Sequence, residues 1–409
     1  MSIKRHFSWM LFSRVVSMAA AMLIGSLVNR ALGPSDRGVY AEMQTWVTMF
    51  SVLFGFSIDS AIYHSGNRQL YVLDDKSRFI TILLTTLFYA CIGLVMFSAF
   101  TYLFPGYFSE KARRYLLFMN LLLFCMMLAL SLTVFLQSLG NIYYAGFISI
   151  AQNVIVAFII AYIYFRNNLS LDNAFIASIV SQVLSIIMLA VYFGQSGFFS
   201  GVFSRSTSIQ LLKNGLTLHV ATIATFAYTK VNQLLVMKYS GAAEAGMFAV
   251  SLNLAFASMI IPGVLQTVLY SRIIHSEDTF EITIKSMKYN FFGWGTIVLL
   301  LVISAEPIIM LYAGIAFRNS VNTFRILMVA AWFLSMSALT APYFVKAGFF
   351  RLMSLSAVLL GLISIVANYF LVQRYASFGA ALATALTSFI GFIFVSLMLF
   401  AEFKKKVLI

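Results

Sequence analysis

The sequence predicts an all-α, polytopic membrane protein of about 12 transmembrane helices in two six-helix lobes, and three observations lead to it. Of the 409 residues, 61% are hydrophobic and only 10% are charged, a composition far outside that of water-soluble domains. Apolar runs of about twenty residues, each long enough to cross about 30 Å of hydrocarbon, follow one another along the chain. A segment near the N-terminus also recurs half a chain length later.

The apolar runs predict helices because backbone groups in lipid must hydrogen-bond within the protein. A transmembrane barrel would instead show stretches of about ten residues with alternating polarity, and these runs lack that pattern. The predicted helices lie near residues 8–32, 38–66, 79–104, 115–138, 142–165 and 173–194, and near 215–240, 244–271, 287–314, 321–345, 352–372 and 377–401. We therefore expect an N-lobe at 1–194, a cytoplasmic linker at 195–214 and a C-lobe at 215–409.

The positions of Lys and Arg predict that both chain ends lie in the cytoplasm. An even number of spans places both ends on one side, and the segments on that side carry more basic residues than the opposite loops. The formal net charge of +14 follows from this bias. Nucleic acid is not an expected partner, because the basic residues lie singly in short loops rather than on one solvated face.

Short loops and scarce cysteines exclude several classes of protein. No predicted loop exceeds about twenty residues, which is too short to fold as a catalytic domain, so we do not expect an enzyme. Cys91 and Cys125 each lie inside an apolar run, where a small polarisable side chain packs well. Neither a disulfide framework nor a metal site is expected.

An internal duplication supports the two-lobe arrangement. At a shift of 208 residues, LVNRALGPSDRGVYA (27–41) aligns with LVMKYSGAAEAGMFA (235–249) without a gap. The aligned pairs include Leu27 with Leu235, Gly33 with Gly241, Asp36 with Glu244 and Gly38 with Gly246. Each copy joins the first and second helices of its half, which predicts parallel repeats around a central cavity. The glycines allow the tight reversal that such a short connection requires.

Ionisable residues inside predicted spans are candidates for a functional path, because each is costly unless it faces a cavity or a partner. They are Arg14, Glu42, Asp59, His64, His219, Lys230, Glu306 and Arg325. Arg14 and Asp59 fall at a similar depth in the first two helices, so they could form a buried ion pair that fixes helix packing. Alternatively, the Arg14 guanidinium could bind an anion in a bidentate manner.

The remaining candidates lie nearer the membrane surfaces. Lys230 and Glu42 fall toward the outer side of the membrane, where they could form a gate or a static salt bridge. Alternatively, the Lys230 side chain could extend to the membrane interface. His64 and His219 lie near cytoplasmic helix ends and could couple protonation to transport, or could be simply hydrogen-bonded. Glu306, near the outer end of its helix, is expected at the interface.

Three segments resemble a known family. LVNRALGPSDRGVYA resembles the first-loop signature of polysaccharide exporters and O-antigen flippases, within the multidrug/oligosaccharidyl-lipid/polysaccharide exporter superfamily. KVNQLLVMKYSGAAEAGMFAVS (230–251) is similar to the family's seventh helix and turn, and AEPIIMLYAGIAFRNSVNTFRILMVA (305–330) to its ninth and tenth helices. The chain departs from the family at Lys230, where an acidic residue is common.

The resemblance implies a MATE-like fold and an alternating-access flippase of the bacterial inner membrane. Such a protein would move an undecaprenyl-diphosphate-linked oligosaccharide from the cytoplasmic to the periplasmic leaflet. On this hypothesis Arg14, Lys230 and Asp59 bind substrate, whereas Glu42, His64, His219 and Glu306 serve gating or ion coupling. No cofactor is expected apart from coupling to H+ or Na+. The expected partners are lipid-linked oligosaccharide, membrane lipid and other polysaccharide-assembly membrane proteins. The transporter itself is expected to be a monomer.

Other functions stay open at this point. A multidrug exporter of the same superfamily, driven by sodium or protons, would carry organic cations. The number of embedded charges does not exclude such an exporter, because the three acids (Glu42, Asp59, Glu306) are equal in number to the three strong bases (Arg14, Lys230, Arg325). A membrane glycosyltransferase, polymerase or ligase would be expected to present a large external loop, which the sequence lacks. A third possibility is a lipid II flippase, but proteins that resemble that group usually have more than twelve helices.

Overall fold

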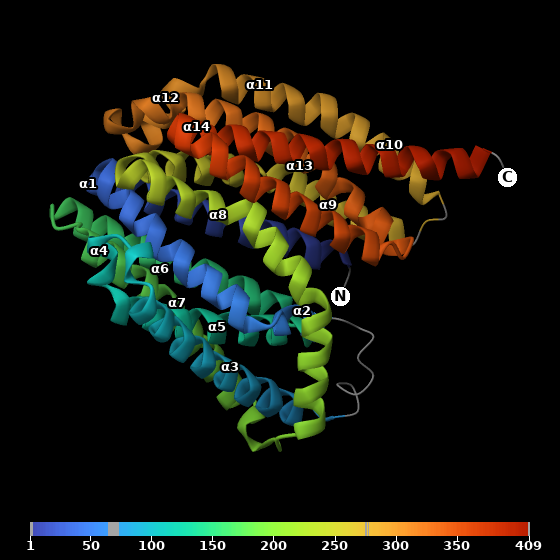
Figure 1. Cartoon of the computed structure of the whole chain (residues 1–409). Helices are drawn as coiled ribbons and strands as arrows, with labels where there is room; N and C mark the ends of the chain where they lie inside the picture. Colours follow the sequence, from blue (N-terminus) through green and yellow to red (C-terminus); the bar gives the residue numbers. More distant parts are fainter. Residues whose placement is uncertain (1–2, 64–72, 275, 277, 408–409) are drawn as a thin grey trace. The chain divides into compact units, whose positions relative to one another are not determined.

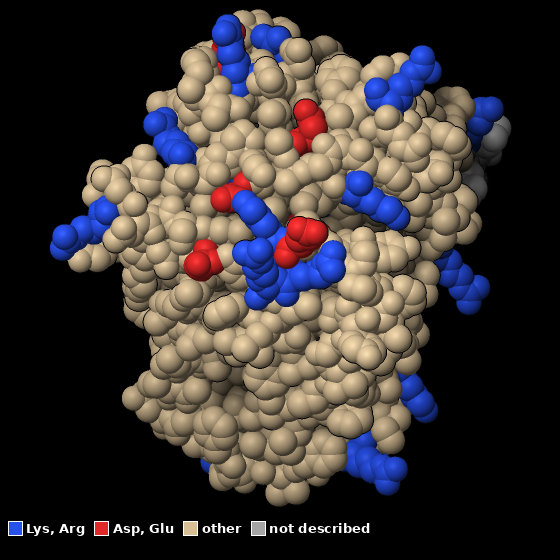
Figure 2. All heavy atoms as spheres, turned by 60° about the vertical axis from the view of Figure 1, so that its left-hand side comes forward, with Lys and Arg blue, Asp and Glu red and all other residues tan. Residues whose placement is uncertain are grey.

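The computed structural model describes residues 3–63, 73–274, 276 and 278–407 (Figure 1). Within these ranges the regular secondary structure is helical, without strands. Nine helical stretches are long and apolar enough to cross a membrane, counted over the described part of the chain. Large apolar side chains such as Tyr102, Leu117 and Phe165 are at least 78% exposed, as expected for surfaces that contact lipid. In Figure 2 uncharged atoms cover most of one face, and charged side chains form scattered groups.

Three of the nine stretches are each two helices joined at a sharp break. α1 (Ile3–Gly55) has 53 residues, which as one straight helix would extend about 80 Å, more than twice the hydrocarbon thickness. A non-helical residue interrupts α1 at Gly33, α8 (Arg205–Ser258) at Gly241 and α14 (Phe350–Val407) at Ala376. The chain turns back in α1 and α14 in Figure 1. Nine stretches with three breaks give twelve crossings in the described ranges, which confirms the predicted fold class.

The other helices follow the predicted spans closely. They are α2 (Ile58–Tyr63), α3 (Asp75–Leu103), α4 (Glu110–Arg113), α5 (Leu116–Ser138), α6 (Ile142–Phe165), α7 (Leu171–Gln195), α9 (Ile260–Ile274), α10 (Thr279–Tyr289), α11 (Gly295–Ile303), α12 (Ala305–Ala313) and α13 (Val321–Lys346). Short 3-10 turns lie at Pro105–Tyr107, Phe198–Ser200 and Ile315–Ser320, and a π-helical turn at Asn290–Trp294 joins α10 to α11. The span predicted at 38–66 is broken between α1 and α2.

Polar residues cap the helices of the first half. The side chains of Asp74, Ser109, Asn141 and Ser170 each accept a hydrogen bond from the backbone N–H three residues on, at the starts of α3, α4, α6 and α7. Such caps satisfy donors that a helix start leaves without intrahelical partners. Asp74 lies outside the spans, and hydrogen bonds from the Ser77 side chain and backbone hold its pKa below the usual value.

The chain divides into two compact units, of which the first comprises residues 1–32 and 42–223. Here α5 packs against α3 and α7, and α7 packs against α6. Phe79, Phe135 and Phe193 are almost fully buried at the centre of this core, with the rings of Phe79 and Phe193 4.4 Å apart. Aromatic packing between neighbouring helices therefore holds the unit together.

The segment between α7 and α8 also belongs to the first unit. The backbone N–H of Val202 donates to Ser77 Oγ at 3.1 Å, and that of Ser204 donates to Thr81 Oγ1 at 3.1 Å. α8 begins at Arg205, so the second part of the predicted linker at 195–214 is helical. Residues 205–223 pack with the first unit. The predicted lobe limits, with an N-lobe at 1–194, a linker at 195–214 and a C-lobe at 215–409, stay a prediction.

The second unit comprises residues 33–41 and 224–409. α13 is its central helix and contacts α9, α10, α11, α12 and α14. Asn290 in the π-helical turn donates to Ser335 Oγ of α13 at 2.8 Å. At the other end of α13, Lys346 Nζ donates to the carbonyls of Ile273 and Ser276 at 2.8 and 2.6 Å, which satisfies groups left free where α9 ends.

The two repeat turns have the same backbone conformation. Gly33 has φ 65° and ψ −179°, and Gly241, 208 residues later, has φ 86° and ψ 177°. Side chains rarely adopt positive φ, so glycine is needed at both positions. The duplication detected in the sequence is therefore repeated in the local structure.

These two turns also pack against each other within the second unit. A Cβ on Gly38 would lie 1.8 Å from the carbonyl oxygen of Ala242, and a Cβ on Gly246 would lie 1.9 Å from that of Pro34. The shift of 208 residues relates Pro34 to Ala242 and Gly38 to Gly246, so the contact is reciprocal. Only glycine permits backbones to approach so closely, which explains the two matched glycines of each copy.

Candidate functional site

Arg14 lines a cavity of about 360 Å³ in the first unit. Its walls come from the N-terminal part of α1, the end of α5 and the first turns of α6, and the lining residues are Met10, Ser13, Arg14, Gln137, Ile142, Ala145, Gly146 and Ser149. The Arg14 side chain is exposed. The cavity therefore combines one strong cation with hydroxyl and amide groups inside an apolar bundle.

Small residues at the start of α6 bring that helix close to α1. A Cβ on Gly146 would lie 2.7 Å from Trp9 Nε1 and 3.1 Å from Ser13 Cβ, so glycine is needed for this approach. Trp9 Nε1 donates to the carbonyl oxygen of Tyr143 at 3.1 Å. The hydroxyls of Ser17 and Ser149 are 3.0 Å apart. These contacts hold the wall that carries Arg14 against the start of α6.

The electrostatics of the Arg14 cavity favour an anion. α6 begins at Ile142, which lines the cavity, so the positive dipole end of this helix lies beside it. No Asp or Glu is among the described lining residues. A guanidinium and a helix N-terminus both suit phosphate groups.

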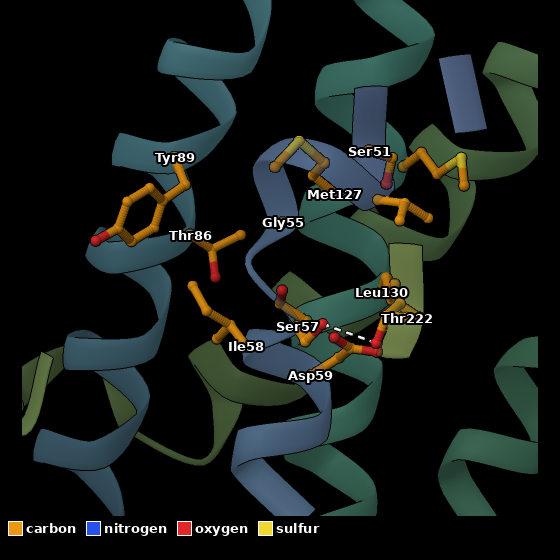
Figure 3. A pocket seen from close by; sticks show the side chains of 13 residues that line it. Ser51, Gly55, Ser57, Ile58, Asp59, Thr86, Tyr89, Met127, Leu130 and Thr222 are labelled. Atoms are coloured by element: carbon orange, nitrogen blue, oxygen red, sulfur yellow. Dashed lines mark hydrogen bonds between the residues drawn. The ribbon is translucent and has the colours of Figure 1, made fainter. Parts of the chain in front are cut away.

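A second cavity of the first unit, about 110 Å³, surrounds Asp59 (Figure 3). It forms where α1 ends and α2 begins, because Phe56 and Ser57 have φ of 47° and 49°. Seven residues with side-chain oxygens line it: Ser51, Ser57, Asp59, Thr86, Tyr89, Ser131 and Thr222. Irregular backbone in a membrane protein is tolerated where it lines a cavity or is buried in protein, and this break fits that rule.

His219 of α8 supports the helix break. Its Nε2 lies 3.1 Å from the Leu53 carbonyl oxygen, and since a carbonyl only accepts, Nε2 carries the proton. Its Nδ1 lies 3.3 Å from Ser57 Oγ, and the Ser57 hydroxyl donates its proton to Thr222 Oγ1 at 3.0 Å. A Cβ on Gly215 would lie 2.2 Å from the Phe56 carbonyl oxygen, so α8 packs directly on the broken backbone.

The structure separates two residues that the sequence placed at one depth. Arg14 lines the larger cavity and Asp59 the smaller one, and no ion pair joins them in the described part of the chain. The alternative of a static Arg14–Asp59 pair is therefore not what the structure forms. Asp59 instead lies beside His219 and Ser57, close enough to His219 for electrostatic interaction.

Glu42 and Lys230 lie in different units. Glu42 is 1% exposed and accepts hydrogen bonds from the backbone N–H and the Oγ of Ser109, at 2.9 and 2.5 Å, so its carboxylate fixes the start of α4. Lys230 is partly buried, with Nζ 5.8 Å from the centre of the Phe256 ring and Arg37 within electrostatic range. A gate made by Glu42 and Lys230 stays a prediction.

Glu306 and Arg325 are not among the described residues that line the two cavities. Glu306 accepts hydrogen bonds from Arg318 at 2.9 Å, and its side chain is 42% exposed. Arg325 donates to the Val302 carbonyl at 3.2 Å and to Asn322 Oδ1 at 3.0 Å. His64 lies outside the described residues.

Sequence reasoning missed the hydroxyl groups around Asp59 and the break that gathers them. Ser57, Thr86 and Thr222 come from three separate parts of the chain, and none is unusual in an apolar helix. The run GFSID at 55–59 carried a signal, because glycine, serine and aspartate together interrupt an apolar stretch.

Comparison with known proteins identifies the family. The sequence model of the family described as "Polysaccharide biosynthesis protein" matches residues 3–273, which is more than half of the chain. The chain belongs to this polysaccharide biosynthesis protein family. It is 23% identical over 413 residues to the "Putative O-antigen transporter" of Shigella flexneri, with 94% of each chain covered. The protein is thus a multi-pass membrane transporter of polysaccharide biosynthesis.

Solved structures share the fold of this family member. The lipid II flippase MurJ in an inward closed conformation matches with a TM-score of 0.77, at 15% identity, over 95% of this chain and 86% of that one. An inward-facing multidrug resistance MATE family transporter of the MOP superfamily matches with a TM-score of 0.72, at 13% identity, over 95% and 96% of the two chains. The predicted MATE-like fold is therefore confirmed.

Proposed function

We propose that this polysaccharide biosynthesis protein is a flippase for an undecaprenyl-diphosphate-linked oligosaccharide. It carries the head group from the cytoplasmic to the periplasmic leaflet of the bacterial inner membrane by alternating access, with both termini in the cytoplasm. The observation that carries the proposal is the Arg14 cavity, in which a strong cation and a helix N-terminus meet without an acid among the described lining residues. Family membership supports the polysaccharide nature of the cargo.

The cargo explains why a membrane protein would hold a cation in such a cavity. Moving one unshielded charge into hydrocarbon has an idealised cost of order tens of kcal/mol, so a diphosphate crosses unaided at a negligible rate. The Arg14 guanidinium can bind two phosphate oxygens at once. The Ser149 hydroxyl lines the same cavity and can donate to phosphate or sugar oxygens, whereas the Ser13 hydroxyl donates to the Met10 carbonyl at 2.9 Å.

The volume of the cavity limits what it can hold. About 360 Å³ equals the liquid volume of about twelve water molecules. This space suits a diphosphate with its adjoining sugar, whereas the rest of the oligosaccharide and the polyprenyl tail must lie elsewhere. We assign the Arg14 cavity to the charged part of the cargo.

Lys230 is the second residue that we assign to the head group. It lies in the second unit with its Nζ 5.8 Å from the centre of the Phe256 ring, and an ammonium group can bind phosphate oxygens. Asp59, predicted as a substrate contact, lines the other cavity and has no place in this assignment. A carrier of organic cations would need acids in its binding cavity, so the Arg14 cavity favours an anionic cargo over a cationic drug.

A flipping assay in reconstituted vesicles tests the proposal. Purified protein is placed in vesicles with a fluorescent undecaprenyl-diphosphate oligosaccharide, and the fraction reaching the outer leaflet is followed with time. We expect Arg14→Ala to slow flipping about ten- to hundredfold, because charge-assisted hydrogen bonds contribute about 1.5–3 kcal/mol each. Asp74→Asn serves as the control, since Asp74 caps α3 and is not among the described residues that line the cavity.

Two results would overturn this function. Wild-type vesicles that fail to flip the diphosphate-linked sugar would exclude it directly. Arg14→Ala protein that flips at the wild-type rate would remove the cavity from the mechanism. Equal amounts of folded variant and wild-type protein in the vesicles, checked by size-exclusion chromatography beforehand, ensure that a slow rate reports on transport rather than on folding.

A further inference from the structure

We propose that the junction between α7 and α8 binds the headgroups of anionic phospholipids. The binding surface, which we call the α7–α8 surface, consists of side chains that are exposed on the connecting segment and on the first turns of α8: Phe199, Val202, Phe203, Arg205, Ile209 and Lys213. All of them belong to the first unit. The proposal concerns the lipid around the protein rather than its cargo, so it goes beyond the proposed flippase function.

The connecting segment is fixed to α3. Its 3-10 turn Phe198–Ser200 packs against that helix (Figure 1), and two backbone N–H groups of the segment donate to hydroxyls of α3 at 3.1 Å each. A Cβ on Gly201 would lie 2.2 Å from the backbone carbonyl oxygen of Lys76, so only glycine permits this approach. Backbone groups that are hydrogen-bonded within the protein can lie at the boundary of a membrane. The segment therefore holds its outward side chains in fixed positions.

Apolar side chains of the segment face outward where two spans end. The span Leu171–Gln195 ends before the segment and the next span starts at Arg205, so the segment lies at one membrane surface. Val202 and Phe203 are 73% and 44% exposed. Such side chains are favoured at the boundary between headgroups and acyl chains, whereas contact with water would be unfavourable. The apolar part of the surface therefore fits a lipid bilayer.

The charge of the surface favours an anion. Arg205 and Lys213 are both exposed on one side of α8, and the eight residues that separate them correspond to about 12 Å along the helix. A Cβ on Gly197 would lie 3.6 Å from Lys76 Nζ, which places a third cation beside the segment. The sequence has no Asp or Glu from residue 173 to residue 243, so the segment and the first part of α8 carry no acid.

The two acids that precede Lys76 have partners of their own. Asp74 caps the start of α3, and Asp75 forms an ion pair with Arg78. In the part of the chain that the structure describes, neither cation of the α7–α8 surface forms an ion pair. Both cations can therefore bind an external anion.

The order of side chains along α8 matches a phospholipid better than a soluble partner. After Lys213 the same side of the helix is apolar, with Leu216 and Val220 45% and 61% exposed. A phosphate held by the two cations would place its acyl chains along these apolar side chains. An acidic protein would match the cations but would leave the apolar side chains without a partner.

Lipid at this surface would act on the helix that leads from one unit to the other. Residues 205–223 of α8 pack with the first unit, and from residue 224 the same helix belongs to the second. With the termini in the cytoplasm, as proposed above, the ligand is a lipid of the cytoplasmic leaflet, whose anionic headgroups attract Lys and Arg. A ligand that binds the folded first unit stabilises it. Anionic lipid therefore stabilises the first unit and holds the start of α8 in place.

Lipid binding to the purified full-length protein tests this surface. Native mass spectrometry and thermal unfolding in detergent compare phosphatidylglycerol with zwitterionic phosphatidylcholine of the same acyl chains, without lipid-linked substrate. We expect the wild type to prefer phosphatidylglycerol and to unfold at a higher temperature in its presence, with both effects reduced by high salt. Arg205→Gln combined with Lys213→Gln should weaken phosphatidylglycerol binding about tenfold and leave phosphatidylcholine binding unchanged.

Arg113→Gln combined with Arg114→Gln is the matched control, because it removes two exposed cations that lie outside the α7–α8 surface and should leave the lipid preference unchanged. An equal loss in this control would overturn the site, as would equal binding of the two lipids by the wild type. If the double variant of the surface does not fold, Lys213→Gln alone should still weaken phosphatidylglycerol binding about threefold, and undiminished binding would overturn the site. Because no lipid-linked substrate is present, failure of this test is separate from failure of the flippase assay.

Discussion

The two cavities of the first unit are opposite in charge and different in size. The larger, about 360 Å³, holds Arg14 beside the start of α6, and the smaller, about 110 Å³, holds Asp59 beside a helix break. Neither charge is paired with the other in the described part of the chain; Arg14 lies within the span Ser8–Gly55, whereas Asp59 lies in α2, after that span ends. The difference teaches that the two charges occupy separate polar environments of one unit and do not form one ion pair that stabilises packing.

Charge reversal at Arg14 should have the largest effect on flipping. Arg14→Glu places an acid beside the cavity that we assign to a diphosphate, so like-charge repulsion is added to the loss of two hydrogen bonds. We expect no measurable flipping of the diphosphate-linked sugar in the vesicle assay, at equal amounts of folded protein. Flipping at the wild-type rate would contradict the assignment of this cavity.

Glycine replacement should distinguish how the two cavities are built. Gly215→Ala puts a Cβ 2.2 Å from the backbone carbonyl oxygen of Phe56, which cannot move aside without shifting the helix break. We expect a loss of about 1–3 kcal/mol in the free energy of unfolding. Denaturant unfolding followed by tryptophan fluorescence measures this loss, with Gly106→Ala, which meets no atom within 4 Å, as control.

The matched change in the larger cavity should be milder. Gly146→Ala meets the side chains of Trp9 and Ser13 at 2.7 and 3.1 Å, and side chains can adjust where backbone cannot. We expect a loss below about 1.5 kcal/mol together with slower flipping, because α1 moves away from α6. A Gly146→Ala protein less stable than Gly215→Ala would contradict this view of the α1–α6 contact.

Asp74 provides the smallest expected effect and a charge control outside both cavities. Its folded-state pKa is lowered by the hydrogen bonds from Ser77, so its stabilising effect is present above the unfolded-state pKa and is lost as pH falls through the folded-state value. Asp74→Asn should slightly flatten the acid side of the stability profile and leave flipping unchanged. A changed flipping rate would show that surface charge contributes to transport.

Much of the fold could be predicted because membrane spans depend on length and hydropathy. The paired glycines were visible too, since Gly33 and Gly241 must both adopt positive φ and recur at a fixed shift. The break at Phe56 and Ser57 was not predicted, because aromatic and aliphatic neighbours keep the local hydropathy high. Depth was inferred for Arg14 and Asp59, but which way each side chain faces depends on packing between helices distant in sequence.

The role of Glu42 illustrates the same limit. Its position in a span suggested a gate, which stays a prediction, and the sequence did not reveal that its carboxylate accepts two hydrogen bonds from Ser109, 67 residues later in the chain. A partner that far away leaves no trace in local sequence pattern. The Asp59 cavity is harder still to foresee, because its oxygens come from α1, α2, α3, α5 and α8.

The most direct test of the central claim is whether Arg14 makes the protein prefer a charged carrier over a neutral one. Binding of undecaprenyl diphosphate and of uncharged undecaprenol is measured by native mass spectrometry on wild-type and Arg14→Ala protein. We predict that the wild type prefers the diphosphate and that Arg14→Ala loses most of this preference while binding undecaprenol as before. An unchanged preference in Arg14→Ala would contradict the account.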